Sequence, residues 1–136
     1  MTLKFETIRQ TVLIDASPDE VYAAYVDPKK HAKFTGQSAE GSPKIGGKFT
    51  AGDGYITAKY IELKKGRKIV QEWMTSEWPE GYPASLLEIT MKPKGKKTEL
   101  TMVHSKVPAE QGDYYAGGWT EFYWEPLKKH FSRVKT

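Results

Sequence analysis

Apolar and polar residues alternate along several stretches of the chain, and a period of two residues predicts β-strands with one buried face. These stretches are residues 7–14, 55–63, 69–74, 84–91 and 99–107. In the first stretch, polar Gln10 lies among the apolar residues of one face. Turns rich in Lys and Gly, at residues 64–68 and 92–97, predict that the later strands pair as hairpins.

Helix signals follow the first strand. Ser17 can cap the first free amides of a helix, Pro18 suits its first position, and Glu20 completes a capping box. Pro28 cannot continue this helix but can start another, which Gly36 then ends. We therefore predict two short helices directly after the first strand.

After Pro108 the apolar period changes to that of a helix, which we expect from about Trp119 to Phe131. The predicted buried stripe comprises Trp119, Phe122, Tyr123, Trp124, Leu127, His130, Phe131 and Val134. Pro126 removes one helical hydrogen bond and should kink this helix. Tyr114 and Tyr115 are expected to precede the helix.

The order of predicted elements is strand, short helices, a run of antiparallel strands and one long helix, which indicates the α+β class. A single amphipathic helix must bury its apolar stripe, and the inner face of the sheet is the large apolar surface available. We therefore predict one domain over residues 1–136, with a curved antiparallel sheet of about six strands wrapped around a long C-terminal helix. Strong curvature commonly leaves a cavity between such a sheet and its helix.

Composition restricts the kinds of site that the chain can form. With 136 residues the chain can bury a core of its own, and without cysteine it has no disulfide, thiolate or Cys-containing zinc site. The lack of cysteine suits a cytoplasmic location, and residues 1–6 show no signal peptide. No apolar run approaches the ~20 residues that span a membrane. The histidines lack metal-ligand spacing, so we expect no metal and no cofactor.

Much of the net charge of +4 comes from the Lys-rich turns at residues 64–68 and 92–97. Neither turn carries an aromatic residue, so we interpret both as solubilising and expect no nucleic-acid partner. The Gly-rich residues 41–54 lack the Gly-Lys-Ser/Thr ending of a phosphate-binding loop. We expect short strands and tight turns there instead.

Ordered motifs give the chain a family resemblance. Residues 16–22 (Ala-Ser-Pro-Asp-Glu-Val-Tyr) resemble the opening of START-like (SRPBCC) domains. Residues 54–73 end in Ile-Val-Gln-Glu-Trp, and residues 100–105 (Leu-Thr-Met-Val-His-Ser) are followed by Gly118-Trp119 and Leu127. Together these motifs resemble the activators of heat-shock-protein-90 ATPase and their stand-alone prokaryotic relatives, over nearly the whole chain.

This resemblance implies a helix-grip fold with an internal pocket. It also implies a chaperone as one candidate partner. In the eukaryotic activators, however, such a domain follows a separate N-terminal domain that carries much of the chaperone contact. We therefore do not expect that domain in the 136 residues. Related groups bind lipids, sterols, hormones or polyketides, so the resemblance also implies a small hydrophobic molecule as a partner.

Aromatic residues make up 12% of the chain and supply the candidate ligand-binding residues. Trp73, Trp119 and Tyr123 are predicted to line the pocket, with plain core packing as the alternative. Tyr114 and Tyr115 are predicted to shape its mouth. Trp78 lies in a loop that contains Pro and Gly. We interpret it as a lid over the pocket or as an exposed anchor for a partner.

His104 shares a predicted strand face with Leu100 and Met102, so its side chain should point inward. It is either a core histidine bonded to its neighbours or a group that bonds a ligand oxygen or exchanges a proton. His31 and His130 are expected at the surface or the rim of the pocket.

No residue is assigned a catalytic role. The chain has no Gly-x-Ser-x-Gly elbow and no cysteine, and His104 and Ser105 point to opposite faces of their strand. Three hypotheses follow. The protein is a carrier or sensor of a small hydrophobic molecule, a protein-interaction module of co-chaperone type, or a cyclase- or hydrolase-like enzyme with His104 as base.

Overall fold

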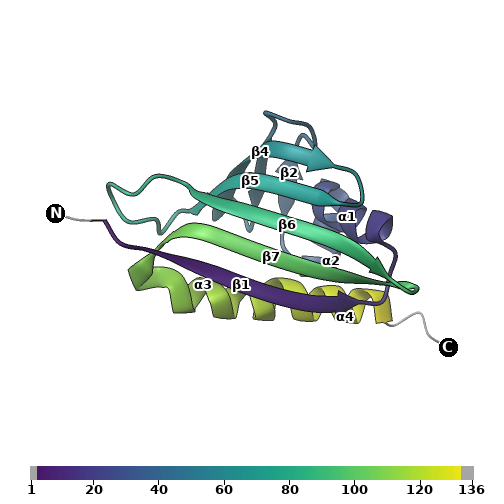
Figure 1. Cartoon of the computed structure of the whole chain (residues 1–136). Helices are drawn as coiled ribbons and strands as arrows, with labels where there is room; N and C mark the ends of the chain where they lie inside the picture. The colour runs from purple at the N-terminus through teal and green to yellow at the C-terminus, as the bar shows by residue number, and fades with distance from the viewer. Residues whose placement is uncertain (1–2, 133–136) are drawn as a thin grey trace.

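The computed structural model describes residues 3–132, which form one antiparallel sheet with the helices on a single face (Figure 1). The strands are β1 (Phe5–Ile14), β2 (Ala39–Gly41), β3 (Lys48–Ala51), β4 (Ile56–Lys64), β5 (Lys68–Thr75), β6 (Ser85–Lys94) and β7 (Lys97–Pro108). Their spatial order is β1-β7-β6-β5-β4-β3-β2. The predicted helix-grip fold is confirmed, with seven strands in the sheet rather than about six.

The short strands β2 and β3 come from the Gly-rich segment. They pair with each other from Ala39 opposite Ala51 to Gly41 opposite Phe49. The turn between them is tight, because a Cβ on Gly47 would collide with the carbonyl oxygen of Ser42. Strands this short show little alternation of apolar and polar residues, so the sequence pattern does not predict their number reliably.

Short helices α1 (Pro18–Val26) and α2 (Pro28–Thr35) follow β1 as predicted. The capping box is present, since the Glu20 amide donates to Ser17 Oγ at 3.2 Å and the Ser17 amide donates to Glu20 Oε1 at 3.0 Å. Gly36 ends α2 in a left-handed conformation, with a φ of 75°. The local sequence therefore fixes both helices before any tertiary contact is considered.

The C-terminal helix begins earlier than the sequence pattern predicts. It runs through α3 (Gly112–Trp119), a π-helical turn (Thr120–Trp124) and α4 (Glu125–Ser132). Tyr114 and Tyr115 therefore lie within the helix and do not precede it. Each glycine costs a helix about 1 kcal/mol relative to alanine, and the glycines of α3 hide its helical pattern.

The π-helical turn changes which side chains face the sheet. The Glu125 amide donates to the Thr120 carbonyl, five residues back, and the following residue, Pro126, has no amide hydrogen. The irregularity expected at Pro126 therefore takes the form of a π turn. Trp124 is buried with 2% exposure, whereas Phe122 is 55% exposed, so the prediction that Phe122 joins the buried stripe is wrong.

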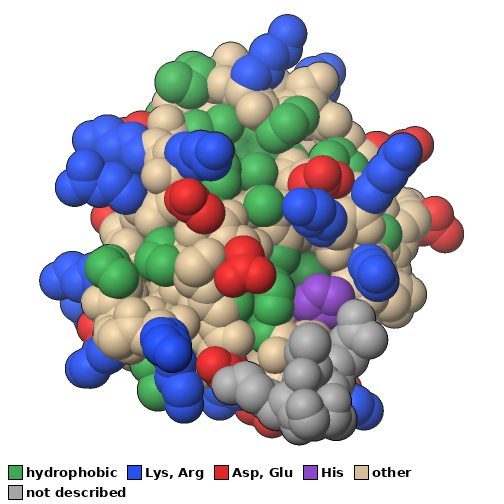
Figure 2. Space-filling model, turned by 90° about the vertical axis from the view of Figure 1, so that its right-hand side faces the viewer, with side chains coloured by type: hydrophobic (Ala, Val, Ile, Leu, Met, Phe, Trp, Pro, Cys, Tyr) green, Lys and Arg blue, Asp and Glu red, His purple; other side chains and the backbone are tan. Residues whose placement is uncertain are grey.

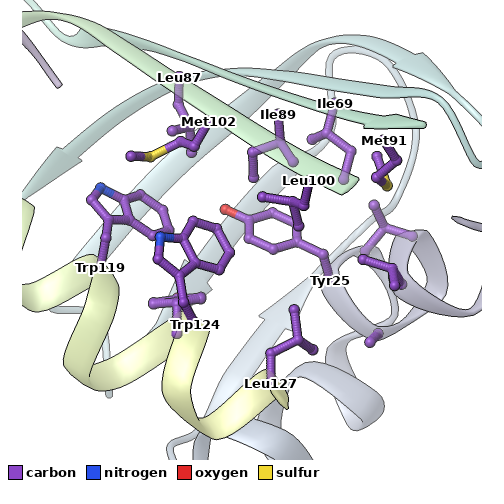
Figure 3. Packing of buried hydrophobic residues seen from close by; sticks show 14 of the residues in the cluster. Tyr25, Ile69, Leu87, Ile89, Met91, Leu100, Met102, Trp119, Trp124 and Leu127 are labelled. Carbon is purple, nitrogen blue, oxygen red and sulfur yellow. The ribbon is translucent and has the colours of Figure 1, made fainter. Parts of the chain in front are cut away.

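The helix and the sheet bury their facing side chains against each other (Figure 3). Trp119, Trp124 and Leu127 point from the helix toward the sheet, with Tyr25 of α1 beside them. Their neighbours from the sheet are Ile69, Leu87, Ile89, Met91, Leu100 and Met102. Each such side chain contributes about 1.5–3 kcal/mol when fully buried. Val134, also predicted in the stripe, lies outside the described residues.

The two Lys-rich hairpin turns, at residues 64–68 and 92–97, lie at the right-hand end of the molecule in Figure 1, the end that faces the viewer in Figure 2. Lys and Arg side chains are spread over this face with Asp and Glu between them. The β4–β5 turn contacts α1, because a Cβ on Gly66 would meet the carboxylate of Asp19. The interpretation of both turns as solubilising segments stays a prediction.

Candidate ligand-binding pocket

A pocket of about 520 Å³ opens between the first half of the C-terminal helix, strands β3 and β4, and the end of α2. Aromatic side chains dominate its lining: Tyr55, Trp73, Tyr114, Tyr115, Trp119, Phe122 and Tyr123. Gly117 and Gly118 form the adjoining surface of the helix. A volume in this range suits a small organic molecule, since ligand sites typically measure about 300–1,000 Å³.

The structure brings most of the predicted ligand-binding residues to this pocket. Trp73, Tyr115, Trp119 and Tyr123 all line it, and all are buried. Each of these residues also packs in the apolar core below the pocket, so each belongs both to the pocket wall and to the core. Their contact with a ligand stays a prediction.

Trp78 lies behind the pocket wall. Its ring packs against Trp73 and Tyr115, with centroid separations of 6.0 and 5.8 Å. Its indole nitrogen donates to the Pro83 carbonyl at 2.9 Å, a hydrogen bond within the β5–β6 loop. Trp78 is half-buried and is not among the residues that line the pocket. This position makes it a support for the wall.

His104 also lies behind the wall, fully buried as the strand pattern predicts. Trp119 Nε1 donates to His104 Nδ1 at 3.1 Å, so the ring proton is on Nε2, which donates to Ser85 Oγ at 2.7 Å. Ser85 Oγ in turn donates to the Trp73 carbonyl at 2.6 Å. Burial lowers the pKa of His104 to about 3, so the ring is neutral. Both ring nitrogens are engaged, which leaves neither to take a proton from a substrate.

The prediction that His31 lies at the surface is wrong, because its side chain is fully buried. His31 Nδ1 donates to the Tyr25 carbonyl at 2.8 Å, and its Nε2 accepts from the Tyr123 hydroxyl at 2.9 Å. Tyr25 donates to Gln71 Oε1 at 2.9 Å. Burial lowers the pKa of His31 to about 4. This histidine therefore fixes Tyr123, one wall of the pocket, to α2.

The mouth of the pocket is formed by Tyr55, Tyr114 and Phe122, of which Tyr114 was predicted to shape it. Tyr114 and Phe122 are 64% and 55% exposed. Tyr55 donates from its hydroxyl to Glu77. The sequence does contain one signal of this pocket, the adjacent glycines Gly117 and Gly118. Two adjacent glycines inside a helix are unfavourable unless bare backbone is needed there.

Three buried polar atoms on neighbouring strands have no hydrogen-bond partner among the described residues. These are Tyr60 Oη, Gln71 Nε2 and Trp73 Nε1. Tyr60 pairs with Gln71 across β4 and β5. Unpartnered buried polar groups are costly, at about 1–3 kcal/mol each, and call for an explanation. Trp73 connects this group to the pocket, since it belongs to the pocket wall.

The space between the sheet and the second half of the helix is filled. A gap of about 10 Å³ lies among residues such as Tyr25, Trp124 and Leu127. A cavity therefore accompanies the first half of the helix and does not extend along its whole length.

Within residues 3–132, no group of His, Asp or Glu side chains is arranged to hold a metal ion. No helix in the same range is long and apolar enough to cross a bilayer.

Known proteins share this sequence pattern. Residues 15–132 match the family described as activator of Hsp90 ATPase homolog 1-like protein. The human activator of 90 kDa heat shock protein ATPase homolog 1 is 31% identical over 125 residues, which cover 92% of this chain and 36% of that protein. The Dictyostelium discoideum homologue is 28% identical over 128 residues, which cover 93% of this chain and 33% of that protein. The chain thus spans about a third of the length of these relatives.

Solved structures share the fold. An HSP90 activator from Plasmodium falciparum superposes with a TM-score of 0.86 at 24% identity, over 93% of this chain and 96% of that chain. The Aha1 dimer from Colwellia psychrerythraea gives a TM-score of 0.78 at 17% identity, over 96% and 99%. Since the family match covers most of the chain and the human relative aligns along nearly all of it, the chain belongs to the activator of Hsp90 ATPase homologue 1-like family.

Proposed function

We propose that this protein carries or senses a small, largely apolar aromatic molecule, which it binds in the pocket beside α3. The observation that carries the proposal is the pocket itself, about 520 Å³ in volume and lined mainly by aromatic side chains. Flat aromatic rings offer large contact areas to a flat ligand, and ring pairs gain about 0.5–1.5 kcal/mol beyond the area that they bury.

The walls of the pocket are held in place before any ligand arrives. Trp73 packs on Tyr115 and Trp119, with ring centroids 5.3 and 5.8 Å apart. The Tyr115 hydroxyl is hydrogen-bonded to Thr75 Oγ1 at 2.6 Å, and Tyr123 is bonded to His31. Because these side chains are already ordered, binding would cost little side-chain entropy.

Native mass spectrometry of the protein purified from its own host would test the proposal directly. We expect a co-purified molecule of small mass that is released on unfolding. A complementary titration uses N-phenyl-1-naphthylamine, an uncharged aromatic probe that fluoresces in apolar surroundings, and should show saturable one-to-one binding. No co-purified molecule together with no saturable fluorescence change would reject the proposal.

We also propose a second function, contact with a heat-shock-protein-90 chaperone. It is favoured by the family, since the human relative of the same family is named as an activator of that ATPase. Calorimetric titration against the chaperone of the same organism, with ATP turnover measured in parallel, tests this function. Neither heat of binding nor a change in turnover would reject it.

The hypothesis of an enzyme with His104 as base receives less support from the geometry. Trp119 and Ser85 occupy both ring nitrogens of His104. Burial also holds its pKa at about 3, far below the range useful to a base at neutral pH.

A further inference from the structure

The charges around the pocket differ from those of the chain as a whole. The protein carries 21 Lys and Arg against 17 Asp and Glu. Among the described residues that line the pocket, however, the charged side chain is the carboxylate of Glu121, and no Lys, Arg or His is present. The excess of positive charge therefore lies elsewhere on the surface.

A second carboxylate contacts the pocket from outside. Glu77 accepts the hydrogen bond of the Tyr55 hydroxyl, and Tyr55 lines the pocket. The pKa of Tyr55 is raised, first by burial and then by this bond to Glu77. The pKa of Tyr115 is also raised, first by burial, with a smaller contribution from the charge of Glu77. These phenols remain neutral at physiological pH.

These features act in the same direction on a charged ligand. The faces of aromatic rings carry partial negative charge and attract cations. An anion placed among them would lose its hydration without gaining a cationic partner, which is strongly unfavourable. It would also be repelled by Glu121.

We infer that the pocket selects flat aromatic molecules that are uncharged or positively charged, and that it rejects otherwise similar molecules that carry an acidic group. This inference rests on the proposed function and names the chemical class of its ligand. The observations behind it are the aromatic lining, Glu121 at the helix side of the pocket and Glu77 on Tyr55. Aromatic amines and neutral aromatic ketones belong to the selected class, whereas aromatic carboxylates and sulfonates do not.

A matched pair of probes separates charge from shape. N-phenyl-1-naphthylamine and 1-anilinonaphthalene-8-sulfonate share one aromatic skeleton and differ by the sulfonate. We expect the neutral probe to bind at least tenfold more tightly than the sulfonate. Binding of neither probe would remove the proposed function, whereas equal or tighter binding of the sulfonate would overturn the charge selection and leave the proposed function standing.

Two charge-reversal variants show whether the selection arises in the pocket. Glu121→Lys should raise the affinity for the sulfonate at least fivefold and leave the affinity for the neutral probe within twofold. Glu125→Lys makes the same change in net charge on the same helix, at an exposed residue outside the pocket lining. It should leave both affinities unchanged. Equal gains in sulfonate binding for the two variants would assign the selection to overall charge and overturn the inference.

Discussion

Trp119 and Trp124 stack on each other, with ring centroids 5.3 Å apart and ring planes at 15°, although they are five positions apart in the sequence. In a regular α-helix, residues five apart point about 140° away from each other. The π-helical turn Thr120–Trp124 accommodates one more residue and brings both indoles to the same face. One ring lines the pocket and the other fills the core beneath it. The π turn therefore connects the binding site to the centre of the fold.

Gln10 stabilises this turn from β1. Its Nε2 donates to the Ala116 carbonyl at 2.9 Å, and its Oε1 accepts from Trp124 Nε1 at 2.7 Å. We expect Gln10→Leu to lower the free energy of unfolding by about 1–3 kcal/mol, because the indole N–H of buried Trp124 would lose its partner. Urea unfolding followed by tryptophan fluorescence measures the loss. Arg9→Leu, at an exposed residue of the same strand, is the control and should change stability little.

The role of Gln10 illustrates how far sequence patterns reach. The strand around it was predicted from alternation, and its polar side chain on an apolar face was visible as an exception. The hydrogen-bond partners of Gln10 could not be predicted, because Ala116 and Trp124 lie more than a hundred residues away in sequence. Periodicity specifies which face of an element is buried, but it does not specify which distant group meets a polar side chain there.

The same limit explains the errors in the candidate site. His31 stands among lysines in the sequence, and its burial depends on the distant hydroxyl of Tyr123. A regular period of 3.6 residues predicts Phe122 on the buried stripe, but the π turn Thr120–Trp124 departs from that period. The sequence predicts that Trp73, Trp119 and Tyr123 either line the pocket or pack in the core, because large aromatic residues on inward-facing positions serve both purposes.

The buried histidines make the stability of the protein depend on pH. Burial lowers the pKa of His31 to about 4 and that of His104 to about 3, against about 6.5 in the unfolded chain. The unfolded state therefore binds more protons below pH 6.5, so this contribution to stability is complete above that pH and is lost as the pH falls. Between pH 6.5 and pH 5, each histidine should cost about 2 kcal/mol.

Urea midpoints at pH 7 and pH 5 measure this effect. NMR titration of the imidazole signals assigns it, since both rings should stay neutral in the folded protein down to pH 5. Stability that is unchanged at pH 5, or titration of either ring near pH 6.5 in the folded state, would contradict the assignment.

Trp78 is expected to affect binding without touching the ligand. Its ring supports Trp73 and Tyr115 from behind, and its indole holds the loop at Pro83. We expect Trp78→Ala to weaken binding of N-phenyl-1-naphthylamine several-fold because the wall would lose this support, whereas Trp78→Phe should retain most of it. If Trp78 instead anchors a partner protein, Trp78→Ala would leave probe binding unchanged and reduce chaperone binding.

Gly118 offers a way to fill the pocket without disturbing the fold. It lies in α3, in a helical segment that also carries Tyr114 and Phe122, and a Cβ placed on it would have Phe122 Cδ2, at 3.9 Å, as its nearest contact. Gly118→Leu should therefore project a side chain into the space that a ligand would occupy. Replacing glycine in a helix should at the same time raise stability by up to about 1 kcal/mol.

The expected result is the loss of probe binding, by at least tenfold, in a protein that is as stable as the original or more so. Thr120→Leu introduces the same side chain at an exposed helical residue that does not line the pocket, and it should bind the probe normally. Because the expected changes in binding and stability have opposite signs, a general loss of structure cannot imitate the result. Full probe affinity in a stably folded Gly118→Leu protein would place the ligand somewhere other than this pocket.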